Sequence, residues 1–508
     1  MTTVLDHNLA RSENIRSRFV QFVGANEATA VVVLTVAGGA LRLFHLGYQS
    51  LWLDELFSYF LARRGWADIV AGTARDTMPP LYYFLLHLAL QFGTDEATIR
   101  FVSLVFGVVT IPLLYAFARL LFDRRTAMAA TAIFSFSPFQ VSYAQEARMY
   151  SQLAFFGLVA LYGFVGAWRE GRFRDWALFV AGTELALYTH NLAIFLLAAV
   201  DLFAVLQWKA WRARGRGLIL SNAAVLVLFA PWLVVLPQQV QGVYSSFWNA
   251  FLTPIDVIAA PAQLVYRNFL PDLALPFGLF GVIGLLAFGV ASAVRAIRGS
   301  SGESWGLRLS IIVFLVPPIL LCAASLLRPI WVLRTLIPAS FGLYLLLGWA
   351  VVNARPRTLS VVFGVIMALG MLVGLANHYS NPKVQNPGTR QAAQALAASY
   401  HEGDAVAHTN DSTALAFMYY EPSLPNQFLE GDPDYENHTS RGRSGEIAGL
   451  VPKDWDTLTA WHNRLWLVVA LDHNEDYQQA QVDEAARRFS PGIAQRVNGI
   501  YLILFTKP

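Results

Sequence analysis

The sequence predicts an α-helical polytopic membrane protein with a C-terminal α/β domain, and three observations support this. Hydrophobic residues make up 56% of the 508 residues and charged residues only 14%, a balance that soluble globular domains do not have. Apolar runs of about the length that crosses a bilayer recur as far as residue 379. From residue 380 the chain is instead polar, with the short alternating patterns of a small folded domain.

The apolar runs predict about eleven transmembrane helices. They lie near residues 28–46, 98–121, 126–141, 149–168, 176–189, 191–207, 217–236, 273–294, 309–327, 335–353 and 359–376. The first run has no small-residue cleavage site behind it, so we expect an uncleaved helix and not a signal peptide. The chain then divides into an N-terminal segment at 1–26, a membrane domain at 27–379 and a terminal domain at 380–508.

Arginine and lysine indicate the orientation of these spans. They concentrate in the N-terminal segment and in the connections at Arg124–Arg125, Arg169–Arg174, Lys209–Arg216, Arg295–Arg308 and Arg355–Arg357. The positive-inside rule makes all of these cytoplasmic, and an odd number of spans then places the C-terminal domain outside. The net charge of +3 is small and spread over many loops, so it gives no indication of a nucleic-acid partner.

The first outer loop, residues 47–96, is predicted to hold juxtamembrane helices that do not cross. The segment Pro79–Leu90 is too short to span a bilayer, and counting it as a span would place the later basic connections outside. The segment Leu51–Arg64 has the pattern of an amphipathic helix lying in the membrane interface. Its apolar face would hold Leu53, Leu56, Phe57 and Phe60, and its polar face Asp54, Glu55, Ser58 and Tyr59.

Asp54 and Glu55 would lie about 100° apart on that helix. One carboxylate can therefore face a site while the other meets water or a neighbouring helix.

The C-terminal segment predicts a small α/β domain. Helices are expected at 388–400, 412–420 and 475–488, and strands at 405–409, 464–471 and 500–506. With the topology above, this domain is extracytoplasmic.

Charged and polar residues gather in the outer loops. They are Asp54-Glu55, Arg75-Asp76, Gln145-Glu146-Ala147-Arg148, His190-Asn191, Tyr266-Arg267, Arg328 and Arg334. Each has a structural alternative: an arginine can anchor a span end, His190 can satisfy backbone, Asp54 can cap a helix, and Glu146 can form a local pair with Arg148. Three separate loops nevertheless supply a carboxylate beside a basic group, which favours one shared site.

Five of these segments together resemble a known family. They are Leu51-Trp52-Leu53-Asp54-Glu55, Asp76-Thr77-Met78-Pro79-Pro80-Leu81-Tyr82-Tyr83, Ser142 to Tyr150, Tyr188-Thr189-His190 and Arg334-Thr335-Leu336-Ile337-Pro338. In this order they resemble bacterial glycosyltransferases of the GT-C superfamily, which includes the protein O-mannosyltransferases and the aminoarabinose transferases of lipid A. The resemblance covers about residues 28 to 350.

The resemblance implies the GT-C fold and a sugar donor linked to polyprenyl phosphate, acting at the outer face of the bacterial cytoplasmic membrane. By position, Asp54 matches the catalytic carboxylate, with Glu146 and Asp76 as further acidic groups. Arg148 and Arg334 lie where they can meet the donor phosphate. The further donor-binding candidates are Tyr82, Tyr83, His190 and Arg267, and the supporting candidates are Glu55, Gln145 and Tyr143. The chain departs from the family at Met78, so a metal or phosphate contact from that position is not carried over.

Physical chemistry gives these groups a reaction. A carboxylate accepts the proton of an attacking hydroxyl, and cations stabilise the leaving phosphate. Such a single displacement inverts the anomeric centre. It requires no cofactor, and the chain has no Gly-rich nucleotide loop. A divalent ion held by Asp76, Glu146 or His190 is the alternative to phosphate binding by arginine alone.

Three rival functions stay open at this point. The first is a secondary transporter or flippase of lipid-linked sugars, since many spans with buried charges also describe carriers. The second is a non-catalytic scaffold whose outer domain binds cell-wall glycan. Among enzymes, the rival is a protein O-mannosyltransferase proper, as opposed to an enzyme acting on a glycan or lipid.

Overall fold

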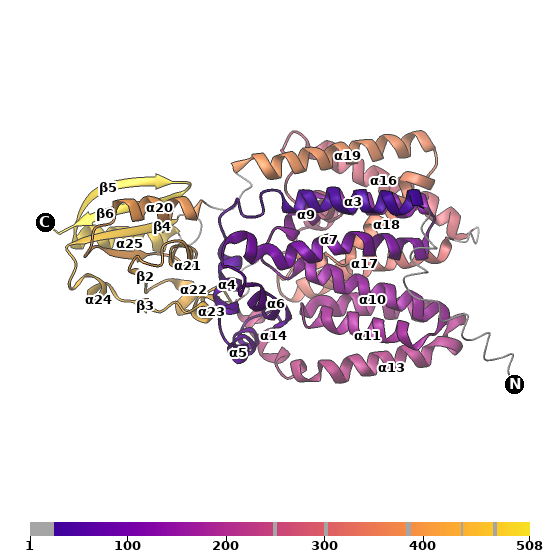
Figure 1. Cartoon of the computed structure of the whole chain (residues 1–508), viewed down its shortest axis with the longest axis horizontal. Coiled ribbons are helices and arrows are strands. Elements are labelled where there is room, and N and C mark those ends of the chain that lie inside the picture. Colours follow the sequence, from indigo (N-terminus) through magenta and orange to yellow (C-terminus); the bar gives the residue numbers. More distant parts are fainter. Residues whose placement is uncertain are drawn as a thin grey trace.

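The computed structural model describes residues 25–246, 251–298, 303–382, 388–437, 440–470 and 475–507. Most of the chain forms a bundle of helices, and the last part forms a sheet flanked by helices beside one end of that bundle (Figure 1). The predicted N-terminal segment lies almost wholly outside the described residues.

Every apolar run that predicts a span contains a helix. These helices are α3 (Ala25–Leu43), α7 (Glu96–Leu121), α8 (Arg124–Phe136), α10 (Tyr150–Glu170), α11 (Phe173–Leu187), α12 (Ile194–Leu206), α13 (Trp208–Leu233), α16 (Leu275–Arg298), α17 (Ser304–Leu327), α18 (Ala339–Asn353) and α19 (Arg357–Ser380). Among the described residues, seven helices are long and apolar enough to cross a membrane, namely α3, α7, α10, α13, α16, α17 and α19. The shorter α8, α11, α12 and α18 have 13 to 15 residues, and their crossing stays a prediction.

The run at 126–141 is interrupted because Pro138 lacks the N–H that a continuing helix needs. Helix α8 ends at Phe136. The Ser137 hydroxyl then accepts a hydrogen bond from the Gln140 N–H, and a new helix, α9 (Pro138–Ala144), begins. This second helix extends to the loop that carries Glu146 and Arg148.

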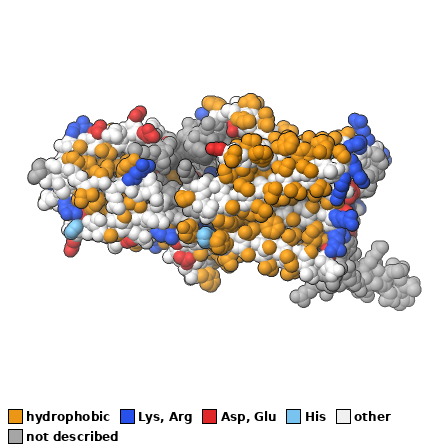
Figure 2. Space-filling view, turned by 90° about the horizontal axis from the view of Figure 1, so that it is seen from above, with side chains coloured by type: hydrophobic (Ala, Val, Ile, Leu, Met, Phe, Trp, Pro, Cys, Tyr) orange, Lys and Arg blue, Asp and Glu red, His pale blue; other side chains and the backbone are white. Residues whose placement is uncertain are grey.

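The bundle has two chemically different ends. The basic stretches predicted to be cytoplasmic lie between helices or in their terminal turns, at the end of the bundle remote from the sheet, and lysine and arginine side chains gather there (Figure 2). Hydrophobic side chains cover most of the face between the two ends. We call the first the basic end and the other, next to the sheet, the domain end.

Short helices fill the domain end of the bundle. They are α4 (Leu53–Ala62), α5 (Trp66–Arg75), α6 (Leu81–Ala89), α14 (Leu236–Ser246) and α15 (Pro254–Tyr266), with 3₁₀ turns η1 (Asn191–Ala193) and η2 (Leu333–Leu336). The nine-residue α6 confirms that Pro79–Leu90 contains a helix too short to cross. The sequence did not predict α5, α14 or α15.

The structure buries much of the face of α4 that the sequence predicts to be polar, and the location of α4 in the membrane interface stays a prediction. Glu55, Ser58 and Tyr59 of that polar face are buried, as are Leu56 and Phe57 of the apolar face. Arg100 of α7 and Arg148 cover Glu55 and Ser58, and the C-terminal domain covers the start of α4 and Tyr59. The Tyr420 hydroxyl accepts a hydrogen bond of 2.8 Å from the Leu51 N–H, and the rings of Tyr59 and Tyr419 meet edge to face at 4.9 Å.

The C-terminal domain contains a six-stranded sheet in the order β3-β2-β1-β4-β6-β5. Its strands are β1 (Ala405–His408), β2 (Asn426–Leu429), β3 (Pro452–Lys453), β4 (Arg464–Ala470), β5 (Ser490–Val497) and β6 (Ile500–Thr506). Strands β1 to β4 pair in parallel, whereas β6 is antiparallel to both β4 and β5. The helices are α20 (Thr389–Ser399), α21 (Asp411–Tyr420), α22 (Pro433–Glu436), α23 (Ser440–Ala448), α24 (Trp455–Thr459) and α25 (Glu475–Arg488).

All three predicted strands and all three predicted helices of this domain are present. The sequence missed β2, β3 and β5. Strand β3 has only two residues, and most of the edge strand β5 is exposed, so neither carries the alternating pattern that predicts a strand.

Candidate active site

Glu55 is saturated by partners from two other elements. Its carboxylate forms two bonds of 2.7 Å with Arg100 of α7, and Oε1 also accepts the Ala147 N–H at 2.8 Å. Glu55 and Arg100 are both almost fully buried. A bidentate pair of this kind is rigid, so Glu55 holds α4 against α7 and against the loop that contains Glu146 and Arg148.

Asp54, the preceding residue, faces a different group of side chains. Its Oδ2 lies 3.4 Å from Nη2 of Arg334 and 3.8 Å from Nε of Arg148. Its side chain is 27% exposed, and Oδ2 has no hydrogen-bond partner among the described residues. At the start of α4 the Glu55 side chain, and not that of Asp54, accepts the Trp52 N–H, at 3.4 Å. Asp54 is therefore a carboxylate with free hydrogen-bonding capacity between two cations.

Arg148 is held by neutral oxygens around its Nη1. This atom donates to the backbone oxygen of Asp54 at 3.3 Å, to Ser58 at 3.2 Å and to the Tyr83 hydroxyl at 3.4 Å. Burial alone would lower the pKa of Arg148, but nearby acidic groups, including Asp54, outweigh it and raise the pKa well above its usual value. Its Nε has no hydrogen-bond partner among the described residues, so a fully charged guanidinium retains a free donor.

Arg334 approaches Asp54 from η2, just before α18. Its guanidinium lies over the ring of Trp52 at 5.7 Å and over that of Tyr150 at 5.5 Å. Stacking on aromatic faces orients a guanidinium without neutralising its charge. Arg148 and Arg334 thus present two positive groups on the same carboxylate oxygen from separate loops.

Glu146 pairs with Arg267 and not with Arg148, which removes the local Glu146–Arg148 pair considered above. Arg267 Nη1 lies 2.5 Å from Oε1 of Glu146 and donates to Ser142 at 2.9 Å. The Arg267 guanidinium also lies over the Tyr143 ring at 4.4 Å. Arg267 has a φ of 55°, a strained region for a residue other than glycine. The pair forms a second ionic group, in which Glu146 Oε2 has no bonding partner among the described residues.

We call Asp54, Arg148 and Arg334 the Asp54 group. His190 is buried and lies close enough to both arginines to interact with their charges. Its Nδ1 accepts the Leu192 N–H at 3.1 Å, which assigns the ring proton to Nε2. Burial and, to a smaller extent, the charges of Arg148 and Arg334 together lower the pKa of His190 to about 3. His190 is therefore a neutral donor, and its Nε2 has no partner among the described residues.

Tyr82 and Gln145 form hydrogen bonds that hold the backbone next to this site. The Tyr82 hydroxyl lies 3.1 Å from that of Ser103, which in turn donates to the backbone oxygen of Arg148 at 2.9 Å. The Gln145 side chain donates to the end of α3, including the Phe44 oxygen at 2.6 Å, and its Oε1 lies 2.8 Å from His378 of α19. Both side chains position the loop that carries Glu146 and Arg148.

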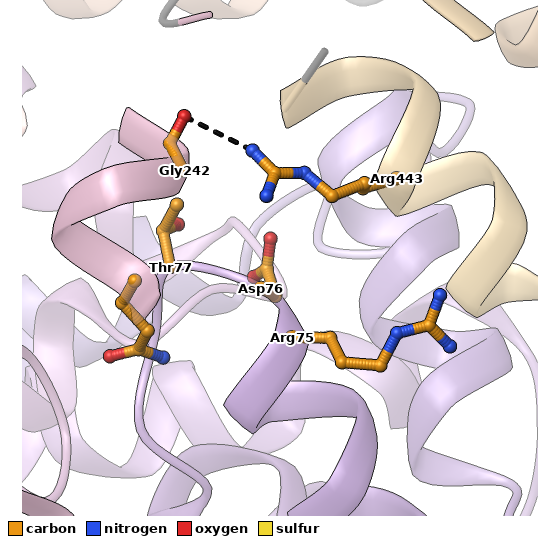
Figure 3. A pocket seen from close by; sticks show the side chains of 6 residues that line it. Arg75, Asp76, Thr77, Gly242 and Arg443 are labelled. Atoms are coloured by element: carbon orange, nitrogen blue, oxygen red, sulfur yellow. Dashed lines mark hydrogen bonds between the residues drawn. The ribbon is translucent and has the colours of Figure 1, made fainter. Parts of the chain in front are cut away.

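Asp76 lies in a separate polar pocket formed by three elements (Figure 3). The residues that line it are Arg75, Asp76, Thr77, Gln239, Gly242 and Arg443. Arg443 extends from α23 of the C-terminal domain and donates to the Gly242 oxygen of α14 at 3.0 Å. Burial raises the pKa of Asp76, and the nearby charges of Arg148 and Arg443 oppose this effect. Asp76 is thus close enough to the Asp54 group to interact with it electrostatically, through Arg148.

Sequence reasoning missed two arginines of this region. Arg100 is a charge near the start of the apolar run 98–121, and such a residue is a signal because it needs a partner. Arg443 lies in a polar tail where an arginine is ordinary, so no signal marked it.

The three candidate metal ligands do not lie together. In the described ranges no group of three His, Cys, Asp or Glu side chains could hold a metal. Asp76, Glu146 and His190 therefore do not meet as a set of three ligands.

Comparisons with known proteins agree with this architecture. The sequence profile of a family described as "Dolichyl-phosphate-mannose-protein mannosyltransferase" matches residues 77–235. An uncharacterized protein of Aquifex aeolicus (strain VF5) is 27% identical over 180 residues, which are 34% of this chain and 36% of that protein. The chain thus aligns with only about a third of the length of this relative.

Solved structures match over nearly the whole chain. ArnT from Cupriavidus metallidurans in the apo state has a TM-score of 0.63 at 16% identity, over 94% of this chain and 98% of ArnT. The same protein bound to undecaprenyl phosphate has a TM-score of 0.61, over 93% and 97%. The Archaeoglobus fulgidus oligosaccharyltransferase in the apo form has a TM-score of 0.52 at 11% identity, over 94% and 74%. These matches confirm the expected GT-C fold, and the chain is a multi-pass membrane protein.

Proposed function

We propose that this protein, which has the GT-C fold, is a membrane glycosyltransferase that moves a sugar from a polyprenyl-phosphate donor to a hydroxyl group. The observation that carries the proposal is the Asp54 group. A carboxylate with an unpartnered oxygen lies beside Arg148 and Arg334, both of which have the charge and geometry to bind phosphate. The ArnT relative was crystallised with undecaprenyl phosphate, which supports a lipid-phosphate donor.

In the proposed reaction, the acceptor hydroxyl transfers its proton to Asp54 as its oxygen attacks the anomeric carbon. The bond between that carbon and the phosphate oxygen breaks, and the electron pair leaves with the lipid phosphate. Arg148 and Arg334 stabilise the charge that develops on this leaving group. Because one displacement occurs at the anomeric carbon, the product has the inverted configuration.

His190 completes the phosphate site in this proposal. Its neutral Nε2–H is buried and unpartnered in the described structure, and buried donors are normally satisfied. A phosphate oxygen between the two arginines supplies the missing acceptor. We assign Glu146 and Arg267 to the neighbouring part of the same outer surface, where the sugar or the acceptor binds.

We further propose that the domain end faces the outside of a bacterial cytoplasmic membrane. The basic end, where lysine and arginine gather (Figure 2), is then cytoplasmic by the positive-inside rule. The Asp54 group, the Glu146–Arg267 pair and the C-terminal domain share the opposite, outer side.

The position of these charges also favours a transferase over a carrier. Asp54, Glu146, Arg148, Arg267 and Arg334 all lie at the domain end, in short elements or connections, and not in the middle of the long apolar helices. Carriers bind their substrates near the bilayer midplane. Transfer to protein hydroxyls is the second candidate, favoured by the family profile over residues 77–235.

The experiment that tests the proposal uses the purified chain and a panel of polyprenyl-phosphate sugars, each offered with glycan, lipid and serine- or threonine-containing peptide acceptors. The readout is release of the free polyprenyl phosphate. We expect release with at least one donor, and the acceptor that becomes labelled decides between the glycan, lipid and protein alternatives. No release from verified folded protein with any donor would contradict the proposal.

A further inference from the structure

A groove of about 390 Å³ lies at the basic end of the bundle, between α3 and α8. The residues that line it are Ala30, Arg124, Arg125, Met128, Ala129 and Ala132. Four of them, at positions 125, 128, 129 and 132, recur at the spacing that places side chains on one face of a helix. The groove therefore has a floor of small apolar side chains and a basic mouth.

The charge at this mouth is only partly neutralised. In the described part of the chain Arg125 forms no ion pair, and Arg124 reaches Glu27 only at 3.8 Å. Glu27 is already bonded to Arg119 at 3.0 Å and to the Tyr115 hydroxyl. The nearby Asp123 points to the start of α8, where it accepts the Thr126 N–H at 2.8 Å. Arg119 and Arg124 thus share the one carboxylate of Glu27, and Asp123 is occupied by the start of α8.

The groove is long enough for part of one acyl chain. Ala132 is seven positions after Arg125, which is about 10 Å along a helix. The arginines lie at the basic end, at the level expected for phosphate headgroups, and the apolar floor extends from there toward the membrane interior. Acidic lipid headgroups attract basic residues at this level of the membrane.

We infer that this groove binds one acidic phospholipid. Its phosphodiester contacts Arg124 and Arg125, and one acyl chain lies against Met128, Ala129 and Ala132. A face of small residues also permits another helix to pack closely. A second copy of the chain would, however, bring its own pair of arginines to the same place, so charge complementarity favours the lipid. The site lies at the end of the bundle opposite the Asp54 group and does not depend on the transferase proposal.

The test measures retained lipid by native mass spectrometry. The purified full-length chain is equilibrated with equal amounts of phosphatidylglycerol and phosphatidylcholine in detergent. We expect the wild type to retain phosphatidylglycerol preferentially. Replacement of Arg124→Gln with Arg125→Gln should weaken this retention about thirty-fold, because each arginine near an anionic surface contributes about five-fold.

Two further variants separate the lipid site from general effects of charge. Replacement of Ala129→Leu with Ala132→Leu keeps both arginines but fills the floor, and we expect it to release the retained lipid. Replacement of Arg295→Gln with Arg298→Gln removes two arginines from α16 that do not line the groove, and we expect unchanged retention. Equal retention of both lipids by the wild type, or unchanged retention by the Arg124/Arg125 variant, would overturn the inference. A dimer of the wild type that the filled variant lacks would instead identify a second copy as the occupant.

Discussion

Asp54 and Glu55 are adjacent carboxylates on α4, yet their surroundings are opposite. Glu55 is fully buried and has all of its capacity used by Arg100 and the Ala147 N–H. Asp54 is partly exposed, and its cations lie 3.4 and 3.8 Å away without a completed hydrogen bond. A satisfied carboxylate fixes structure, whereas a partly satisfied one retains capacity for a substrate. In the proposed function, Glu55 supports the site and Asp54 takes part in the reaction, although both lie within one turn of the same helix.

The largest effect on stability is expected at the satisfied carboxylate. Replacement of Glu55→Gln leaves Arg100 buried without a full counter-charge, and breaking a buried pair in this way costs about 3–5 kcal/mol. Thermal unfolding of the purified variant measures it. Asp54→Asn is the matched control, and its stability should change by less than about 1 kcal/mol because the pair it breaks is partly exposed. Equal unfolding temperatures for both variants would remove the distinction.

At the partly satisfied group, Arg334 should affect chemistry instead of folding. Arg334→Gln removes a donor that stabilises the leaving phosphate, so we expect transfer to slow by about 10² to 10³. Arg334→Lys keeps the charge but loses the planar guanidinium, so its rate should lie between those of the wild type and of Arg334→Gln. Steady-state rates of polyprenyl phosphate release measure both. If Arg334→Gln unfolds more readily but keeps the wild-type rate per folded molecule, Arg334 has a structural role like that of Glu55.

His190 offers a smaller test of the same phosphate site. Its Nε2–H is a neutral donor to an anion, so His190→Ala should cost roughly ten- to hundred-fold in rate, and His190→Gln, which keeps a donor there, should restore much of it. The pKa of about 3 means that the ring stays uncharged as the pH rises from 5 to 8. The ratio of wild-type to His190→Gln rates should therefore be constant over this range. A step near pH 6.5 in that ratio would contradict the assignment.

Asp76 should show the smallest effect, and it concerns stability against pH. Burial raises its pKa, so the folded molecule binds this proton more readily than the unfolded chain does. The stabilising contribution is present below the unfolded pKa and is lost as the pH rises through the folded value. We therefore expect Asp76→Asn to unfold at a higher temperature than the wild type at pH 7.5, by on the order of 2 °C, and to lose this advantage progressively as the pH falls toward the unfolded pKa. An increase in the unfolding temperature of Asp76→Asn over that of the wild type as the pH falls would contradict this prediction.

Sequence patterns predicted the parts of the fold that repeat one simple signal. Apolar length located the helices of the bundle, and alternation located β1, β4 and β6. The same patterns did not locate α5 or α14, which have only 10 and 11 residues and lie next to longer predicted elements. They also did not show that the polar face of α4 is buried, because Glu55 and Ser58 meet Arg100 and Arg148 from other segments, and Tyr59 packs on Tyr419 from the far end of the chain.

The residues of the candidate site could be predicted from the sequence, but their pairing could not. The sequence motifs identified Asp54, Arg148, Arg334 and His190, and the structure places them together. The partner of each charge depends on which loops meet in space, so sequence proximity suggested Glu146 with Arg148 where the structure has Glu146 with Arg267. Arg443 reaches the Asp76 pocket from a separate domain, a contact that no local pattern encodes.

The central claim is that Asp54 accepts the proton of the attacking hydroxyl. The most direct measurement compares the rate of polyprenyl phosphate release by the wild type and by Asp54→Asn, per folded molecule and with a donor that the wild type uses. Our account predicts a loss of about 10² to 10⁴ in rate, the usual contribution of a general base, with unchanged folding and with donor binding retained. Near-normal release by the folded Asp54→Asn variant would contradict it.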